Sequence, residues 1–317
     1  MKLVFCGTPR FAVPTLDALL AAGHEVALVV SQLDRPVGRS QQFTAPPVKQ
    51  SAQSAGLTVT QPDKIRNNSE FRAQLEAIAP DAIVVVAYGR IIPPWMLALP
   101  RLGCINLHAS LLPKYRGAAP IQWAVARGET VTGNSTMLLE EGLDTGPILL
   151  QQTFPIAPEQ TAADLFDALA EAGAPLVVET LAGLANGTIQ AQPQDHSQAT
   201  LAPLLNREDG RMDFATHTAT ELWNRWRGFQ PWPGAFTTLD GKKLIVHHMG
   251  AVGFTSLDNV QPGQIHLEGH RLFAACAQNT WIELLEVQLE GKKRLMTAEF
   301  LRGTALAVGA RLGTPAQ

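Results

Sequence analysis

Asn106, His108 and Asp144 carry the kinds of side chain that acyl-transfer chemistry requires. An amide and an imidazole can donate hydrogen bonds to a developing oxyanion, and a carboxylate can move protons. Asn106 and His108 have the same parity, so on an extended strand both side chains leave the same face. Asp144 follows 36 residues later (144 − 108), in a Gly-Leu-Asp-Thr-Gly turn whose glycines allow close approach of a ligand. From the residues alone, a structural strand-end histidine and an ordinary turn remain open alternatives.

The first 150 residues alternate between apolar strand patterns and helical patterns. Strands are expected over residues 2–7, 25–31, 58–60, 81–87 and 104–108. Helices are expected over residues 11–20, 48–55 and 70–78, with another over 161–185. This alternation predicts a doubly wound, mostly parallel α/β sheet.

Polar segments follow several of these strands directly. Gly7-Thr8-Pro9, Tyr88-Gly89-Arg90 and Asn106–Pro113 all lie at carboxyl ends of expected strands. Ligands of doubly wound sheets bind beyond those ends, so we expect these segments to converge on one site.

The pattern changes in the second half of the chain. Residues 190–206 are rich in Gln, Pro, Ser and Ala, which predicts a linker. Short alternating stretches after Asp213 are separated by Asp-Gly and Glu-Gly turns, which predict a small β domain of the kind that can close as a barrel. We therefore expect a catalytic domain over 1–189 and a β domain over 207–317. Trp223 and Trp226 have helical i,i+3 spacing, which favours a core seam.

Composition and missing motifs exclude several classes of protein. The chain is 46% apolar and 17% charged with a net charge of −3, and its three cysteines form no CxxC pair. We expect no transmembrane segment, no secretion signal and no disulfide framework, and thus a cytoplasmic protein. The absence of GxGxxG, GxxxxGK[ST], HExxH and GxSxG argues against dinucleotide, P-loop, zinc-protease and serine-hydrolase functions.

The Asn-x-His-x-Ser-Leu-Leu-Pro motif, followed by an aspartate in a Gly-rich loop, resembles the formyltransferases that use 10-formyltetrahydrofolate. Further segments are similar to the branch of that family that formylates methionyl-tRNA, and the similarity covers nearly the whole chain. These segments are residues 5–12, 34–39, 116–122, 208–214 and 231–233. The resemblance implies a Rossmann-like formyl-transfer domain followed by a C-terminal barrel resembling an OB fold.

The resemblance also implies roles for individual residues. Asn106, His108 and Asp144 would be the catalytic residues. The folate would contact Ser110, Leu111, Leu112, Pro113, Tyr88, Gly89, Arg90, Ile91 and Ile92. A charged initiator tRNA would contact Arg35 and Arg39 with its acceptor end, and its phosphates would contact Lys242, Lys243, Lys292, Lys293 and Arg294. No metal and no membrane is implied, and we expect a monomer.

In the implied reaction the free amine of methionyl-tRNA attacks the formyl carbon of the folate. Asn106 and a protonated His108 would donate hydrogen bonds to the oxyanion, and Asp144 would favour the charged imidazole and relay a proton through water. After Arg39 the family often has glycine and two lysines, whereas this chain has Ser40-Gln41-Gln42-Phe43, which reduces the positive charge of the loop. Alternatives are a nucleotide-sugar amine as acceptor, hydrolysis of the formyl folate, or a non-catalytic RNA-binding protein.

Overall fold

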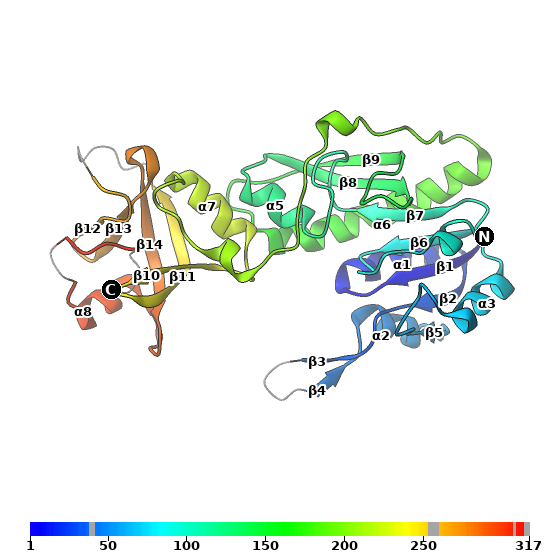
Figure 1. The fold of residues 1–317 in the computed structure, drawn as a ribbon, viewed down its shortest axis with the longest axis horizontal. Helices are drawn as coiled ribbons and strands as arrows, with labels where there is room; N and C mark the ends of the chain where they lie inside the picture. Colours follow the sequence, from blue (N-terminus) through cyan, green and yellow to red (C-terminus); the bar gives the residue numbers. More distant parts are fainter. Residues whose placement is uncertain (38–41, 253–259, 307–308, 314–317) are drawn as a thin grey trace. The chain divides into compact units, whose positions relative to one another are not determined.

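The computed structural model describes residues 1–37, 42–252, 260–306 and 309–313 (Figure 1). The chain forms two compact units. The first consists of residues 1–120, 131–156 and 164–203, and the second of residues 121–130, 157–163 and 204–317. Residues 121–130 and 157–163 therefore belong to the second unit, although no sequence pattern indicated this.

The first unit is built on a seven-stranded sheet with the strand order β5-β2-β1-β6-β7-β8-β9. Its strands are β1 (Lys2–Gly7), β2 (Glu25–Val30), β5 (Val59–Thr60), β6 (Ala82–Val86), β7 (Cys104–His108), β8 (Val131–Leu138) and β9 (Ile148–Pro155). The strands from β5 to β7 are parallel, and β8 and β9 continue the sheet antiparallel. The predicted mostly parallel α/β sheet is thereby confirmed, whereas β8 and β9 were not predicted.

Helices lie beside the strands of this sheet (Figure 1). They are η1 (Arg10–Ala12), α1 (Val13–Ala21), α2 (Pro47–Ser54), α3 (Ser69–Ile78), α4 (Pro94–Leu97) and α6 (Ala162–Asn186), with the short 3-10 turn η2 (His196–Gln198). Helix α3 begins where the side chain of Asn68 accepts a hydrogen bond from the Phe71 amide at 3.0 Å. Helix α3 buries Phe71 and Leu75 in a core that also contains Cys6 and Cys104. Both cysteines are thus core filler, as expected, and burial raises the pKa of Cys104 to about 12.

Among the described residues, α6 is the one helix long and apolar enough to cross a bilayer, and half of its most apolar stretch is buried inside the structure. It packs on the antiparallel part of the sheet. The Thr180 hydroxyl lies 2.8 Å from that of Thr136 on β8, and the Asn134 amide donates to the Leu169 carbonyl at 2.8 Å. These contacts are those of a core helix.

The polar loop after β2 contains a small hairpin. β3 (Arg35–Val37) pairs antiparallel with β4 (Gln42–Thr44), while residues 38–41, including Arg39, lie outside the described part of the chain. The start of the hairpin is anchored by Asp34, which accepts hydrogen bonds from Lys49 Nζ at 2.9 Å and from Gln61 Nε2 at 2.8 Å.

The second unit is an antiparallel sheet with the order β10-β11-β14-β13-β12, and β15 also pairs with β14. Its elements are β10 (Ala235–Leu239), β11 (Lys242–Val252), β12 (Ile265–Glu268), β13 (Arg271–Ala275), β14 (Trp281–Leu289), β15 (Arg294–Met296), α5 (Pro120–Ala126), α7 (Ala219–Gly228), α8 (Thr297–Gly303), η3 (Arg207–Gly210) and η4 (Ala277–Asn279). Arg311 pairs with Gln264, beside β12, and Leu312 pairs with Leu239 on β10. This segment therefore connects the two edges of the sheet, as a barrel requires.

On α7, Trp223 and Trp226 stack with their ring centres 5.0 Å apart and are buried, which confirms the predicted core seam.

Most of the segment expected as a linker belongs to the first unit. Gln192 forms a bridge with Ile148, at the start of β9, and Leu201 forms a parallel bridge with Arg116. Gln194 and Ala202 are buried. Residues 190–203 therefore form part of the folded unit that carries the candidate site.

Candidate active site

The carboxyl ends of β1, β6 and β7 meet, because these three strands are neighbours in the sheet. Thr8, after β1, donates from Oγ1 to the carbonyl of Tyr88, after β6, at 3.0 Å. Asn106 and His108 close β7 beside them. The predicted convergence of these three segments is thereby confirmed.

Asn106 is buried to 9% exposure, and its side-chain amide has no hydrogen-bond partner among the described residues. A buried amide ordinarily finds a partner, because leaving it without one costs about 1–3 kcal/mol. The amide of Asn106 is therefore available to hydrogen-bond a substrate oxygen.

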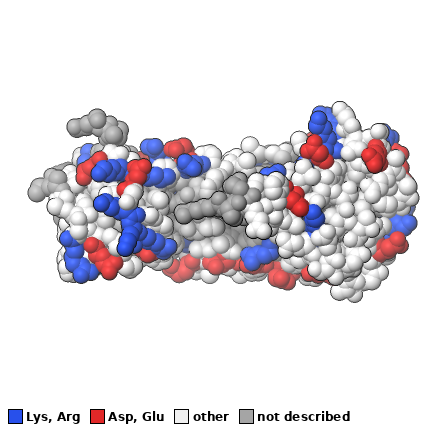
Figure 2. Space-filling view, turned by 90° about the horizontal axis from the view of Figure 1, so that it is seen from below, with Lys and Arg blue, Asp and Glu red and all other residues white. Residues whose placement is uncertain are grey.

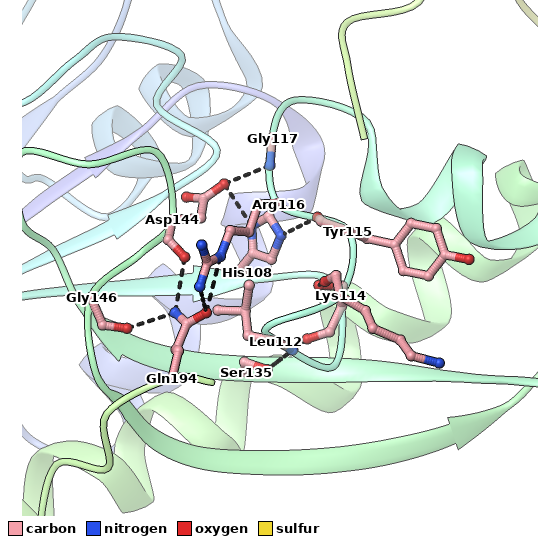
Figure 3. Close-up of polar contacts among 11 residues, drawn as sticks. His108, Leu112, Lys114, Tyr115, Arg116, Gly117, Ser135, Asp144, Gly146 and Gln194 are labelled. Atoms are coloured by element: carbon pink, nitrogen blue, oxygen red, sulfur yellow. Dashed lines mark hydrogen bonds and ion pairs between the residues drawn. The ribbon is translucent and has the colours of Figure 1, made fainter. Parts of the chain in front are cut away.

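The ring of His108 is engaged on both sides (Figure 3). Nε2 lies 2.8 Å from the carbonyl oxygen of Tyr115, and because a carbonyl can only accept, Nε2 carries a proton. Nδ1 lies 3.7 Å from Oδ2 of Asp144. Both ring nitrogens therefore face acceptor oxygens. To donate to an oxyanion, His108 has to give up one of these two contacts.

Asp144 is held in an uncommon backbone conformation. Its φ is +50°, in the left-handed region that few non-glycine residues adopt. Its Oδ2 accepts a hydrogen bond from the Gly117 amide at 2.7 Å, in addition to facing His108. The structure thus brings His108 and Asp144 together as expected from the sequence, with Asn106 two residues from His108 on β7.

Two residues that the sequence did not single out for this role connect to Asp144. Arg116 is only 6% exposed and donates from Nη2 and Nε to Gln194 Oε1 at 2.6 and 3.1 Å. Gln194 in turn donates from Nε2 to the carbonyls of Asp144 and Gly146 at 2.9 and 2.6 Å. No sequence signal marked Gln194, because it lies in the polar segment expected as a linker.

The segment after β7 is anchored by buried polar side chains. Ser110 Oγ donates to the Lys114 carbonyl at 2.6 Å, and Ser135 Oγ donates to the Ser110 carbonyl at 2.6 Å. The carbonyl of Leu112, which precedes a cis bond to Pro113, accepts from Gln151 at 2.9 Å. The Ser110 hydroxyl and the Leu112 carbonyl are thus occupied within the protein, while Leu111 and Pro113 are half-buried and can contact a ligand.

The loop after β6 presents few side chains outward. Tyr88 is 2% exposed and packs in the core with Cys6, and Ile92 is also buried there. Ile91 is 89% exposed, Gly89 is exposed with a φ of +76°, and Arg90 is half-buried and hydrogen-bonds the Asp63 carbonyl. Of the residues expected to line a pterin pocket, Gly89, Arg90 and Ile91 therefore remain accessible.

Comparison with known proteins identifies the family of the chain. Residues 1–181 match the formyl transferase family, and residues 204–305 match the C-terminal domain of formyl transferases. The chain belongs to the formyl transferase family. It is 66% identical over 313 residues to the methionyl-tRNA formyltransferase of Acidobacterium capsulatum, covering 99% of this chain and 100% of the relative. It is 58% identical to the methionyl-tRNA formyltransferase of Koribacter versatilis, covering 96% of each chain.

Solved structures share the fold of this formyl transferase at low sequence identity. The structure of HypX from Aquifex aeolicus in complex with tetrahydrofolic acid has a TM-score of 0.59 at 17% identity, covering 95% of this chain and 48% of that chain. An N-formyltransferase from Helicobacter canadensis in complex with folinic acid and dTDP-3-aminofucose has a TM-score of 0.64 at 18% identity, covering 90% of this chain and 98% of that chain.

Cations of the second unit gather at one end of its sheet. Because Leu244 pairs with Leu289, the turn before β11 and the turn after β14 lie side by side, and the Glu290 amide donates to the Lys243 carbonyl at 2.8 Å. Lys242, Lys292 and Lys293 are exposed at these turns. Lys243 Nζ lies 3.9 Å from the centre of the Phe236 ring, and Arg294 pairs with Glu286. Figure 2 shows Lys and Arg side chains over this unit with acidic side chains between them.

Arg35 is connected to the loop after β6. Its Nη2 donates to Gln32 Oε1 at 2.8 Å, and Gln32 Nε2 donates to the carbonyls of Tyr88 and Gly89 at 2.9 and 3.2 Å. Gln32 thus joins the start of the hairpin to the loop after β6.

Within the described residues no group of three or more His, Cys, Asp and Glu side chains is arranged to hold a metal ion.

Proposed function

We propose that this formyl transferase moves the formyl group of 10-formyltetrahydrofolate to the free amino group of methionyl-initiator tRNA, which gives formylmethionyl-tRNA for translation initiation. The observation that carries the proposal is the 66% identity to a methionyl-tRNA formyltransferase over the full length of both chains. The Asn106, His108 and Asp144 cluster supports it, because these side chains suit formyl transfer to an amine.

Asn106 serves as the ready hydrogen-bond donor. When an amine attacks a formyl carbon, negative charge develops on the formyl oxygen, and a preorganised donor aimed at that oxygen stabilises the transition state. The Asn106 amide is buried and has no described protein partner, so it can donate without first breaking a bond inside the protein. Loss of one such donor typically reduces turnover by about 10²–10³.

His108 and Asp144 hold and move protons. The Tyr115 carbonyl fixes the proton on Nε2 of His108, and Asp144 Oδ2 faces Nδ1 at 3.7 Å. A charged His108 that turns one N–H to the formyl oxygen adds a second donor there. Asp144 takes up the proton that the attacking amine loses, directly or through a water molecule, and returns it to the folate nitrogen as the bond between that nitrogen and the formyl carbon breaks, which releases tetrahydrofolate.

The loops beside this cluster suit a flat, partly apolar co-substrate. Ile91, Leu111 and Pro113 offer accessible apolar surface, and Gly89 offers backbone without a side chain. When bound, the folate supplies an activated formyl group, and the protein supplies position and electrostatics. We further propose that Arg35, Arg39, Lys242, Lys243, Lys292, Lys293 and Arg294 contact the tRNA, and that the protein acts as a monomer in the cytoplasm without a membrane partner.

One assay tests the proposed function. Purified protein is mixed with 10-formyltetrahydrofolate and either charged or uncharged initiator tRNA. Formylmethionyl-tRNA should form with the charged tRNA alone. Release of free formate at the same rate with and without tRNA would identify a hydrolase, and turnover with an amino sugar nucleotide but not with tRNA would identify a sugar-modifying enzyme.

A further inference from the structure

Tyr115, Arg116 and Gly117 hold both members of the His108–Asp144 pair. The Tyr115 carbonyl accepts from His108 Nε2 at 2.8 Å, and the Gly117 amide donates to Asp144 Oδ2 at 2.7 Å. The Arg116 side chain between them is directed to Gln194 (Figure 3). This segment therefore sets where the imidazole and the carboxylate lie relative to each other.

Gln194 uses the whole hydrogen-bonding capacity of its amide group. Arg116 has only donors, so it must face Oε1, and the carbonyls of Asp144 and Gly146 can only accept, so they must face Nε2. These partners leave one possible orientation of the amide. With 6% exposure, Gln194 is a rigid connection between Arg116 and the 144–146 turn.

The 144–146 turn needs such a connection. Asp144 has a φ of +50°, a conformation that is unfavourable for a non-glycine residue and persists only where its surroundings hold it. Without Gln194, the carbonyls of Asp144 and Gly146 lose the donor that they share, and the backbone of Asp144 can relax. Relaxation would move the carboxylate away from His108.

We propose that Gln194 and Arg116 are positioning residues for formyl transfer, which hold the 144–146 turn so that the Asp144 carboxylate faces His108. The proposal rests on the proposed function. Neither residue touches the reacting atoms in this scheme, and both act through Asp144. A shift of about 1 Å in a reacting group can reduce turnover by roughly 10², so their effect should fall on kcat.

Gln194→Glu separates positioning from packing. The glutamate has nearly the same size and keeps an acceptor for Arg116, but its carboxylate cannot donate to the two carbonyls. We expect kcat to fall by about 10–100-fold, with KM for folate and tRNA within about threefold of wild type and with the variant still folded by circular dichroism. Gln192→Glu is the matched control, since Gln192 is exposed two residues earlier, and its kcat should stay within about twofold.

A second pair of variants tests whether Gln194 acts through Asp144. If it does, Gln194→Ala should reduce kcat in the wild-type background and add no further loss in the Asp144→Ala background. Full additivity of the two losses would overturn the proposal, as would a wild-type kcat for Gln194→Glu.

A crystal structure of Gln194→Glu gives a readout that does not depend on the acceptor. Asp144 should leave the left-handed region or move away from His108. If Asp144 kept its positive φ and its 3.7 Å distance to His108, positioning by Gln194 would be excluded. An inactive wild type in the tRNA assay would instead contradict the proposed function and leave this structural comparison unaffected.

Discussion

Asn106 and His108 project from the same strand but are prepared for reaction in different ways. Asn106 has no described protein partner to give up, whereas His108 is bonded to the Tyr115 carbonyl and faces Asp144. The amide can therefore donate to a substrate oxygen without first losing a protein contact, whereas the imidazole has to give up a contact when a substrate binds. In the proposed reaction we therefore expect Asn106 to supply electrostatic stabilisation and the other two residues to move the proton.

Alanine substitution at each of the three positions tests this division. Asn106→Ala, His108→Ala and Asp144→Ala should each reduce kcat by at least about 10², because each removes a group that acts on the transition state. Folate affinity, measured by equilibrium fluorescence titration, should be largely retained. Near wild-type turnover in any one variant would remove that residue from the mechanism.

Tyr88 offers a test in which the expected change is favourable. Its hydroxyl is buried without a hydrogen-bond partner among the described residues, and burial raises the pKa of its phenol. Tyr88→Phe should increase the free energy of unfolding by up to about 1 kcal/mol, because it removes an unsatisfied polar group. KM for the folate should stay within about twofold, since the ring points into the core. Urea unfolding and initial rates measure the two effects, and a large rise in KM would show that the phenol contacts the ligand.

At the scale of elements, the parallel strands of the first unit were predictable and its antiparallel strands β8 and β9 were not. β6 is Ala-Ile-Val-Val-Val and fully buried, so its sequence is a continuous apolar run, as a strand covered on both faces requires. β8 is buried over residues 132–137 but contains Thr132, Asn134, Ser135 and Thr136. The Thr136 hydroxyl lies beside that of Thr180 on α6, and no local pattern reveals a partner 44 residues away.

The candidate site was only partly predictable from the sequence. Asn106 and His108 could be chosen from side-chain chemistry and strand-end position, and Asp144 from side-chain chemistry and its Gly-flanked turn. Gln194 could not, because its partners Arg116 and Asp144 lie 78 and 50 residues away in the chain. A Gln- and Pro-rich composition indicates a linker unless tertiary contacts are known.

The anchor of the β3–β4 hairpin makes a prediction about pH. Hydrogen bonds from Gln61 and Lys49 lower the pKa of Asp34, so the charged carboxylate stabilises the folded state at pH values above its unfolded pKa. That contribution is lost as the pH falls through the lowered folded pKa. Asp34→Asn should therefore reduce the midpoint of urea unfolding at pH 7, and its difference from wild type should shrink below about pH 4.

A matched variant makes the Asp34 measurement specific. Asp63→Asn changes an exposed carboxylate and should leave the unfolding midpoint within error at each pH. A difference between wild type and Asp34→Asn that grew as the pH fell would contradict the assigned role of the charged carboxylate.

At the scale of the whole molecule, a chain with a net charge of −3 is proposed to bind a polyanion. Binding must then depend on where the cations lie rather than on their number. The turns before β11 and after β14 bring lysines from positions about 50 residues apart to one end of the sheet, while the segment after Arg39 lacks lysine. We expect the second unit to supply a large part of the tRNA affinity.

The double variant Lys292→Gln/Lys293→Gln tests this distribution of charge. Each lysine that contacts a phosphate releases about one counterion on binding, so removing both should raise KM for tRNA and reduce the salt dependence of KM by up to about two logarithmic units per decade of salt. The kcat at saturating tRNA should not change, because the lysines act on binding alone. Lys64→Gln/Arg66→Gln removes two exposed cations of the first unit and is the matched control. If the control changed the salt dependence and the lysine pair did not, the tRNA would be bound by a different surface.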